Sequence, residues 1–415
     1  MSKNKKQNRK TNKHTDNLPP PFPSNKYGSG IEPESNGFLS IASSDAYKIA
    51  IETSYEGFAT DDHFDGCQEE EIQKSLSVMD DAGLFRFDIT QPFGLGTKCA
   101  KTYVSRCLLG EDGTTYRYLG LRMFSHPWNG NFAAGDSSGT ELRDAINRIS
   151  KLNLKLEERA ESLLPGLKKK RIRRGISAQD AIRGRSKFDV ALINKMDSSE
   201  ELKAEPTFGG ARCSVSWHAD SSLEHYSTIA VYQTIMEDEK AQKKSTMNAR
   251  SSWSVALRVM HNAEGPAASS TKTDSQASTS SDIPPILASL PSGSAYFLLD
   301  NFNHHHQHAV IAPSDPVRSV RFSSTHRLLR EGGNVAFILE RCATTCSNFH
   351  RKGPKVWRSE QLLLTEIETE WLRQFFIQGE GNKNLLWKVR LFSLPRQYLE
   401  FIMKLVRDSS HGCLH

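Results

Sequence analysis

A histidine and an aspartate separated by one residue lie at the end of a stretch that is typical of a β-strand. The stretch reads VSWHAD from residue 215 to residue 220, and the pair is His218 and Asp220. Alternate side chains of a strand point to the same face, so an imidazole nitrogen and a carboxylate oxygen at this spacing can bind one metal ion. Because such pairs also arise by chance, this one needs support from residues elsewhere in the chain.

A tract of histidines, HHHQH from residue 304 to residue 308, precedes the apolar run at 309–311. One imidazole from this tract would complete a set of two histidines and one carboxylate. That facial set leaves positions open on Fe(II) for a cosubstrate and O₂. His308 adjoins the apolar run, so it is the better candidate for an inward-pointing ligand. The alternative is a surface tract with adventitious metal affinity.

A third motif, RFSSTHR from residue 321 to residue 327, places an arginine at the start of a strand-like run. An enzyme that uses 2-oxoglutarate must hold the distal carboxylate of this cosubstrate away from the metal. A guanidinium suits that task because it pairs bidentately and keeps its charge. Arg321 fits this role, and the alternative is a surface arginine on a strand. The order His-x-Asp, His and then Arg is more specific than any of its parts.

The elements that must position these motifs are predicted to be short strands. Between about 187 and 340, β-branched and aromatic runs recur at 188–193, 213–217, 228–236, 253–260, 295–300, 308–312 and 335–340. Regular short strands of this kind argue for a sandwich or barrel, in which distant strands can close round one site. A Ser/Thr/Ala-rich segment, 262–285, is expected to be a mobile loop between two strands.

The first half of the chain predicts helices and a hairpin. Helical spacing indicates a helix over 69–81, with Gly83 as its stop. Strand-like runs at 103–109 and 116–124 flank an Asp-Gly step, which is typical of a hairpin. Thr140 resembles the N-cap of a long amphipathic helix whose stripe contains Leu142, Ile146, Ile149 and Leu156 and ends at Pro165-Gly166.

Composition and charge place broad limits on the protein class. The chain has 415 residues, of which 37% are apolar and 25% charged, and no apolar run approaches the roughly 20 residues of a membrane helix. The N-terminus lacks the apolar core of a secretory signal, and the seven cysteines include no Cys-x-x-Cys pair, so we expect an intracellular protein with reduced thiols. A net charge of +6 favours polyanionic partners only slightly.

Two segments are strongly basic. Residues 1–35 have few apolar groups, and we expect a disordered tail whose lysines serve as a nuclear localisation signal, a nonspecific phosphate contact or a solvated surface. The run KKKRIRR from residue 168 to residue 174 is the densest positive charge in the chain. It is a nuclear import signal, a phosphate-binding strip or a solvated loop.

Taken together, these motifs resemble the AlkB-like dioxygenases and, within them, the fat-mass-and-obesity-associated (FTO) demethylases. The resemblance runs from about Leu84 to Gly379. It rests on YVSR at 103–106, TYRYL at 115–119, LIN at 192–194, VSWHAD at 215–220, QH at 307–308, RFSSTHR at 321–327 and EWLRQF at 370–375. The last two runs are the most diagnostic.

The resemblance implies an α+β fold with a double-stranded β-helix (jelly-roll) catalytic core and flanking helices. The catalytic domain would span 36–345, followed by a short helical C-terminal domain over 346–415. It also implies a role for each matching residue. Fe(II) would be bound by His218, Asp220 and His308. The distal carboxylate of 2-oxoglutarate would be held by Arg321, Tyr296 and Ser323, and its metal-proximal end by Asn194 and Arg327. Arg318 is a second candidate for the carboxylate role of Arg321.

The methylated base would lie in a pocket beside the iron, in contact with Arg106, Tyr118, Leu119, Val215 and Ser216. Ser221 departs from the family, which usually has an acidic residue there, so base selectivity is expected to differ. The implied reaction is oxidative removal of methyl groups from N6-methyladenine or 3-methylpyrimidines, with O₂ and 2-oxoglutarate as cosubstrates and formaldehyde, succinate and CO₂ as products. A loop at 198–212 resembles the family's duplex-excluding loop and favours single-stranded RNA or DNA in the nucleus.

Two other functions compete with this one. The same metal site could oxidise a protein or a small molecule. Alternatively, the chain could be a noncatalytic nucleic-acid-binding scaffold that retains the barrel. The first would be indicated by oxidation of peptides or metabolites only, and the second by RNA binding without a metal-dependent thermal shift.

Overall fold

The computed structural model describes residues 38–40, 44–62, 64, 69–90, 100–111, 114–118, 121–129, 138–197, 203–204, 212–237, 253–260, 283–312 and 319–330. Several predictions lie wholly or mainly outside these residues: the tail at 1–35, the loops at 198–212 and 262–285, the strand at 335–340, and the C-terminal helical region at 346–415.

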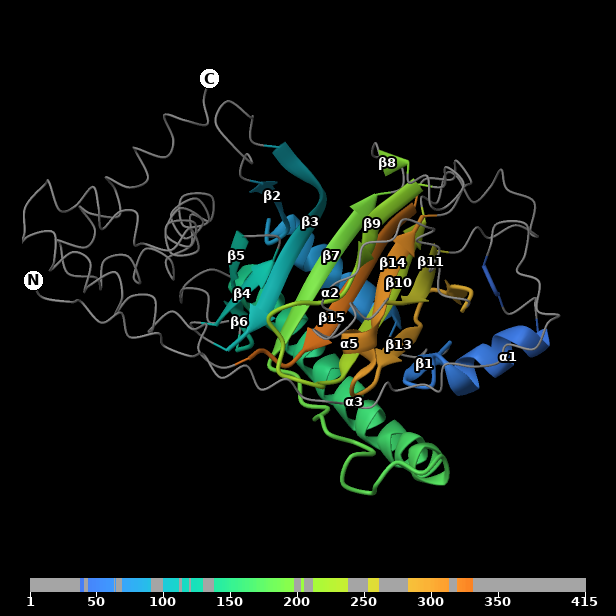
Figure 1. Cartoon of the computed structure of the whole chain (residues 1–415). Helices are drawn as coiled ribbons and strands as arrows, with labels where there is room; N and C mark the ends of the chain where they lie inside the picture. The colour runs from blue at the N-terminus through green and yellow to red at the C-terminus, as the bar shows by residue number, and fades with distance from the viewer. Residues whose placement is uncertain are drawn as a thin grey trace, which may run out of the picture.

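Two antiparallel sheets form the centre of the molecule (Figure 1). The larger has eight strands in the order β1 (Phe58–Asp61), β13 (Ala295–Leu298), β10 (Ile229–Glu237), β15 (Ser319–Arg327), β7 (Val190–Asp197), β3 (Ala100–Gly110) and β2 (Arg86–Thr90), with β6 (His126–Pro127) parallel to the end of β3. The smaller has five, in the order β12 (Ile286–Leu290), β11 (Trp253–Val259), β14 (His306–Ile311), β9 (Arg212–His218) and β8 (Lys203–Ala204).

The inner faces of the two sheets share one apolar core. Val231 and Tyr296 of the larger sheet belong to the same buried cluster as Val255, Leu257 and Val310 of the smaller sheet. Strand alternation explains this, because every second side chain of each strand points to the space between the sheets. Two antiparallel sheets that enclose a core, with helices outside, confirm the predicted α+β fold with a double-stranded β-helix.

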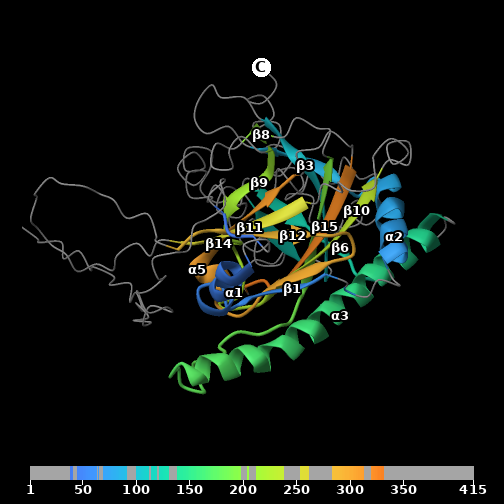
Figure 2. The ribbon, with the colours of Figure 1, turned by 90° about the vertical axis from the view of Figure 1, so that its right-hand side faces the viewer.

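Two helices cover the outer face of the larger sheet (Figure 2). They are α2 (Glu69–Asp81) and α3 (Ser138–Arg173). The stripe predicted for α3 is buried, and it packs with outward side chains of the sheet such as Ile193 and Phe322. The prediction of α2 is also confirmed, and Gly83 follows it with a positive φ of 71°, a conformation that glycine adopts at low cost.

The helix α3 is longer than the sequence suggested. It begins at Ser138 rather than after Thr140, and it continues through Pro165 to Arg173, so the prediction that it ends at Pro165-Gly166 is wrong. Proline removes one helical hydrogen bond. The turns beyond it are nevertheless held in place, since Leu167 and Arg171 are both only 4% exposed.

The basic run at 168–174 is therefore not a loop. Residues 168–173 form the end of α3, and the side chain of Arg171 points into the protein. Its Nε donates to Glu56 at 3.0 Å and its Nη1 to Asp300 at 2.5 Å. Arg174, the last residue of the run, also donates to Glu56, at 2.8 Å. At least two of the seven residues thus have a structural role, which a count of charges could not reveal.

The predicted hairpin between 103–109 and 116–124 is wrong in its pairing. β4 (Thr115–Tyr118) pairs with β5 (Leu121–Phe124) in a separate two-stranded sheet. Both edges of β3 are already occupied, one by β2 and the other by β7. β2 pairs with Ala100 to Arg106 and β7 with Ser105 to Gly110, so a returning strand could not pair along β3 without displacing part of one of them.

The remaining predicted strands within the described residues are confirmed as β7, β9, β10, β11, β13 and β14. Two short helices were not predicted, α1 (Ser44–Thr53) and α5 (Phe302–His305). None of the helices in the described residues has the length and apolar character that crossing a membrane requires.

Candidate functional site

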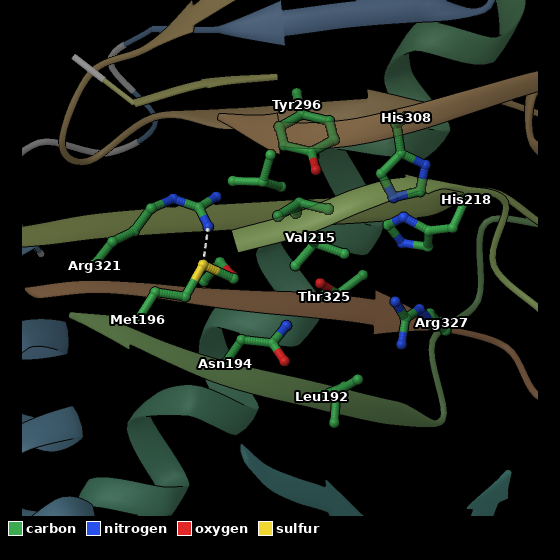
Figure 3. A pocket seen from close by; sticks show the side chains of 13 residues that line it. Leu192, Asn194, Met196, Val215, His218, Tyr296, His308, Arg321, Thr325 and Arg327 are labelled. Atoms are coloured by element: carbon green, nitrogen blue, oxygen red, sulfur yellow. Dashed lines mark hydrogen bonds between the residues drawn. The ribbon is translucent and has the colours of Figure 1, made fainter. Parts of the chain in front are cut away.

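The three predicted metal ligands converge. His218 ends β9, and His308 is its Cα partner on the neighbouring strand β14. Asp220 lies two residues beyond the strand, with Oδ1 3.7 Å from Nε2 of His218. One ligand atom from each residue lies within 4.8 Å of the other two. Figure 3 shows the two imidazoles facing each other, with ring centroids 4.1 Å apart.

The pairing of β9 with β14 is irregular next to the ligands. The register shifts between His308 and Val310 and again between Val310 and Ile311. Such bulges bend a strand and redirect its side chains, and they are frequent beside active sites. The irregular register therefore helps to bring His218 to the side chain of His308.

Asp220 is held at both its main chain and its side chain. Asn303 of α5 accepts the Asp220 N–H at 2.9 Å and donates to the Asp220 carbonyl oxygen at 2.9 Å. Arg327 of β15 donates to the two carboxylate oxygens at 3.0 and 2.8 Å. Burial alone would raise the pKa of Asp220, but the charge of Arg327, followed by the two imidazoles, outweighs it and lowers the pKa.

These groups fit a divalent metal such as Fe(II). Burial, and then repulsion from His218, lowers the pKa of His308 to about 3, so its imidazole is neutral at physiological pH and a ring nitrogen lone pair is available. The lowered pKa of Asp220 keeps its carboxylate ionised. A neutral imidazole and an ionised carboxylate both belong to the donor set of a facial-triad iron site.

The opposite end of the site is formed by Arg321, which has no exposed surface (Figure 3). Its Nε donates to Gln233 at 2.6 Å, and its Nη1 lies 3.4 Å from the sulfur of Met196. Its Nη2 has no hydrogen-bond partner among the residues that the structure describes. Burial lowers the pKa of Arg321 to about 10, so the group stays charged at neutral pH. A buried cation with an unsatisfied donor suits a carboxylate ligand.

One cavity joins the two ends. It encloses about 410 Å³ of space free of protein atoms, open solvent at its mouth included. Eight predicted residues line it: Asn194, Val215, His218, Tyr296, His308, Arg321, Ser323 and Arg327. Burial raises the pKa of Tyr296 to about 12, so its hydroxyl remains protonated and can donate.

Several lining residues were missed by the sequence analysis. They include Leu192 and Met196 of β7 and Thr325 of β15. Each lies two residues from a predicted residue of the same strand, Asn194 in β7 and Ser323 or Arg327 in β15. The period of two along a strand could therefore have identified them. Gln233 had no such signal, because it contacts Arg321 from a different strand, β10.

The predicted base contacts are placed less completely than the metal ligands. Arg106 is buried in β3, opposite Asn194 in register, with Nη1 donating to the Val104 carbonyl oxygen at 3.0 Å. It does not belong to the described cavity wall, and neither does Ser221, which is exposed. For Tyr118 and Ser216 only the main chain is described, in β4 and β9, and Leu119 lies outside the described residues.

The histidine tract is not a surface tract. His306 is 3% exposed, and its ring nitrogens lie 3.0 and 2.8 Å from the carbonyl oxygens of Phe302 and Ser54. His304 accepts the Tyr226 N–H at 3.0 Å. These residues fix the chain that leads to His308.

The chain matches the family described as FTO catalytic domain over residues 45–330. It is 30% identical over 328 residues to the alpha-ketoglutarate-dependent dioxygenase FTO of Xenopus laevis. The matched region is 71% of this chain and 61% of the length of that relative.

Two solved structures are more distant. OsALKBH1 has a TM-score of 0.34 and 13% identity, with 66% of this chain and 96% of that chain covered. JOX2 in complex with 2OG, Fe and JA has a TM-score of 0.32 and 10% identity, with 71% and 75% covered. By its match over most of the chain, the protein belongs to the FTO catalytic-domain family.

Proposed function

We propose that this chain is an Fe(II)- and 2-oxoglutarate-dependent dioxygenase that removes N-methyl groups from nucleobases in single-stranded RNA or DNA. The observation that carries the proposal is one cavity lined at one end by two imidazoles, which lie close to the carboxylate of Asp220, and at the other by an incompletely paired guanidinium. A 2-oxo dicarboxylate has a metal-chelating end and a distal carboxylate, which is the ligand such a cavity accommodates.

Residues of both sheets would bind the cosubstrate. His218, Asp220 and His308 would hold the iron. Arg321 would pair with the distal carboxylate, assisted by the hydroxyls of Tyr296 and Ser323, which line the same cavity. When bound, the iron supplies the activation of O₂ that oxidises the methyl carbon.

The protein contributes orientation and exclusion of water. Arg327 keeps the carboxylate of Asp220 in a fixed position by two hydrogen bonds. Leu192, Val215 and Val310 give the cavity apolar walls, which strengthen the charge interactions of the bound dicarboxylate by reducing solvent screening. Asn194 lies between the two ends and would contact the metal-proximal part of the cosubstrate.

The proposed substrates are N6-methyladenine or 3-methylpyrimidines. Three observations support them: membership of the FTO catalytic-domain family, a relative named as an alpha-ketoglutarate-dependent dioxygenase, and a net charge of +6 that suits a polyanion. A base must leave its stack to reach a buried metal, and an unpaired strand makes that step less costly. We also propose a nuclear location, with the basic residues of 1–15 or of 168–174 as the signal.

The test is a mass-spectrometric survey of modified nucleosides. The protein is incubated with Fe(II), 2-oxoglutarate and methylated single-stranded oligonucleotides, with His218→Ala as the control. Loss of one methylated nucleoside, matched by formaldehyde and succinate, is expected for the wild type only. Succinate release with unchanged methylated bases would instead contradict the substrate class.

A further inference from the structure

Gln233 lies against Arg321 and has no exposed surface. It belongs to β10, where it is the Cα partner of Ser323 on β15. Its side-chain oxygen accepts the Nε hydrogen of Arg321 at 2.6 Å. Gln233 is therefore in direct contact with the residue proposed to bind the distal carboxylate, without itself lining the cavity.

The orientation of the Gln233 amide is determined by its other contacts. Its Nε2 donates to the Pro291 carbonyl oxygen at 2.8 Å and to the Ser294 hydroxyl at 3.3 Å. Its main chain is bonded to the same turn, through Gly293 and Ser294, each at 3.0 Å. Because the nitrogen faces these acceptors, the oxygen must face Arg321.

This contact leaves one part of the guanidinium for a ligand. Gln233 occupies Nε, and the sulfur of Met196, a weak acceptor, lies beside Nη1. The ring of Trp253 lies 5.5 Å from Cζ and limits movement of the group on that side. Nη2 is the nitrogen without a partner in the described part of the chain.

The neutrality of Gln233 distinguishes Arg321 from two other buried arginines. Arg171 is paired with the carboxylates of Glu56 and Asp300, and Arg327 with that of Asp220. Each of these charges is compensated within the protein. Arg321 instead contacts two neutral groups among the described residues, the amide of Gln233 and the thioether of Met196. Neither compensates its positive charge, which can therefore bind an anion that enters the cavity.

We propose that Gln233 is a positioning residue that sets which edge of the Arg321 guanidinium meets a carboxylate, and that it thereby determines selectivity for a dicarboxylate over a monocarboxylate 2-oxo acid. The inference rests on the proposed function, because it assumes that a 2-oxo acid binds in this cavity. It adds a residue outside the cavity wall that controls which 2-oxo acid is accepted.

The test compares two ligands of equal carbon number, 2-oxoglutarate and 2-oxopentanoate, which lacks the distal carboxylate. Their binding to the full chain is measured by calorimetry with Mn(II) in place of Fe(II) and without O₂, so no turnover is needed. Gln233→Glu places a carboxylate against Arg321, which competes with the ligand. We expect 2-oxoglutarate to bind about tenfold more weakly or worse, given the usual strength of hydrogen bonds to charged groups. The affinity for 2-oxopentanoate should not change.

A matched control is available on the smaller sheet. Gln307 accepts hydrogen bonds from Arg258 Nε at 2.8 Å and Nη2 at 2.6 Å, and it does not line the cavity. Gln307→Glu therefore makes the same chemical change beside another arginine. It should leave the ratio of the two affinities as in the wild type.

Gln233→Met serves as a second variant, because a buried carboxylate facing the Pro291 carbonyl oxygen could prevent folding. Methionine preserves the volume and removes the acceptor, so the selectivity ratio should fall here as well. An unchanged ratio in every Gln233 variant that folds, or an equal loss for both ligands, would overturn the inference. A wild type that binds neither ligand would contradict the proposed function itself.

Discussion

The two sheets contribute to the site in different ways. Asn194, Tyr296, Arg321, Ser323 and Arg327 come from the larger sheet, in which β15 pairs with β7 without interruption from Val320 to Arg327. His218 and His308 come from the smaller sheet, where the register shifts next to them. Asp220 lies beyond the end of its strand.

This difference shows where the site is rigid and where it depends on added contacts. The residues proposed to bind the cosubstrate carboxylate stand on a regular ladder, whose spacing determines their positions. The proposed metal ligands stand on a bulged pair of strands and a loop, so hydrogen bonds from Asn303 and Arg327 are needed to place Asp220. Changes to the side chains that hold Asp220 in place should therefore affect metal binding more than they affect binding of the distal carboxylate.

The largest effect is expected from His308→Ala, which removes a ligand from the smaller sheet. Substitution of a residue that only hydrogen-bonds to a metal ligand commonly lowers metal affinity or activity by about 10- to 100-fold. Removal of the ligand itself should therefore lower them by more than about 100-fold. Metal affinity and turnover should fall together. Retention of wild-type Mn(II) affinity would show that His308 is not a ligand.

A change on the larger sheet should weaken 2-oxoglutarate binding and leave metal binding unchanged. Arg321→Lys keeps the positive charge but loses the planar fork and the bond to Gln233. We expect 2-oxoglutarate affinity to fall by about 10- to 100-fold, with metal affinity unchanged. Calorimetry with Mn(II), before and after addition of 2-oxoglutarate, separates the two. Equal losses of both affinities would contradict the division between the sheets.

The regular part of the site was predicted from the sequence, Arg321 from the chemistry of a guanidinium on a strand, and Ser323 and Arg327 from the family resemblance. Period two explains why the three lie on one face of a strand. His218 and Asp220 were identified by the same argument. The contacts of Arg327 with Asp220 could not be predicted, since they join a strand to a loop far away in the chain. The same applies to Gln233, and to the buried Arg171, which the sequence places in a run of otherwise similar charges.

Asn303 tests the dependence of the metal end on added contacts. Asn303→Ala removes both hydrogen bonds to the main chain of Asp220 while leaving all three ligands in place. Metal affinity should fall by about tenfold, the lower end of the range for residues that orient ligands. The selectivity between 2-oxoglutarate and 2-oxopentanoate, which the larger sheet determines, should stay the same. An unchanged Mn(II) affinity would mean that the loop is held sufficiently by Arg327.

The smallest effect concerns the pH dependence of the larger sheet. His326 is fully buried, with Nδ1 2.6 Å from Asn153 Oδ1, and burial followed by the charge of Arg327 lowers its pKa to about 3. Between this value and the ordinary pKa of about 6.5, the unfolded chain binds a proton that the folded chain does not. Stability should therefore fall as the pH decreases through this interval, by at most about 1.4 kcal/mol per pH unit for this group.

The measurement is the free energy of unfolding of the metal-free protein in urea at several pH values. His326→Gln should show a shallower decrease below pH 6.5 than the wild type, whatever its stability at neutral pH. His306, at the smaller sheet, has a pKa lowered to about 4 by burial and contributes in the same direction. Identical slopes for the wild type and the His326 variant would rule out a neutral buried imidazole at this position.

The burial of Arg171 limits how another protein could bind the basic run at the end of α3. A receptor that binds basic peptides in extended form would have to unwind the last turns of this helix. That would expose Leu167 and leave Glu56 and Asp300 without their cation, a costly state for buried carboxylates. Binding of this run as an extended peptide thus requires local unfolding of the helix. A receptor that binds the intact helix would contact only the lysines and arginines that point outward.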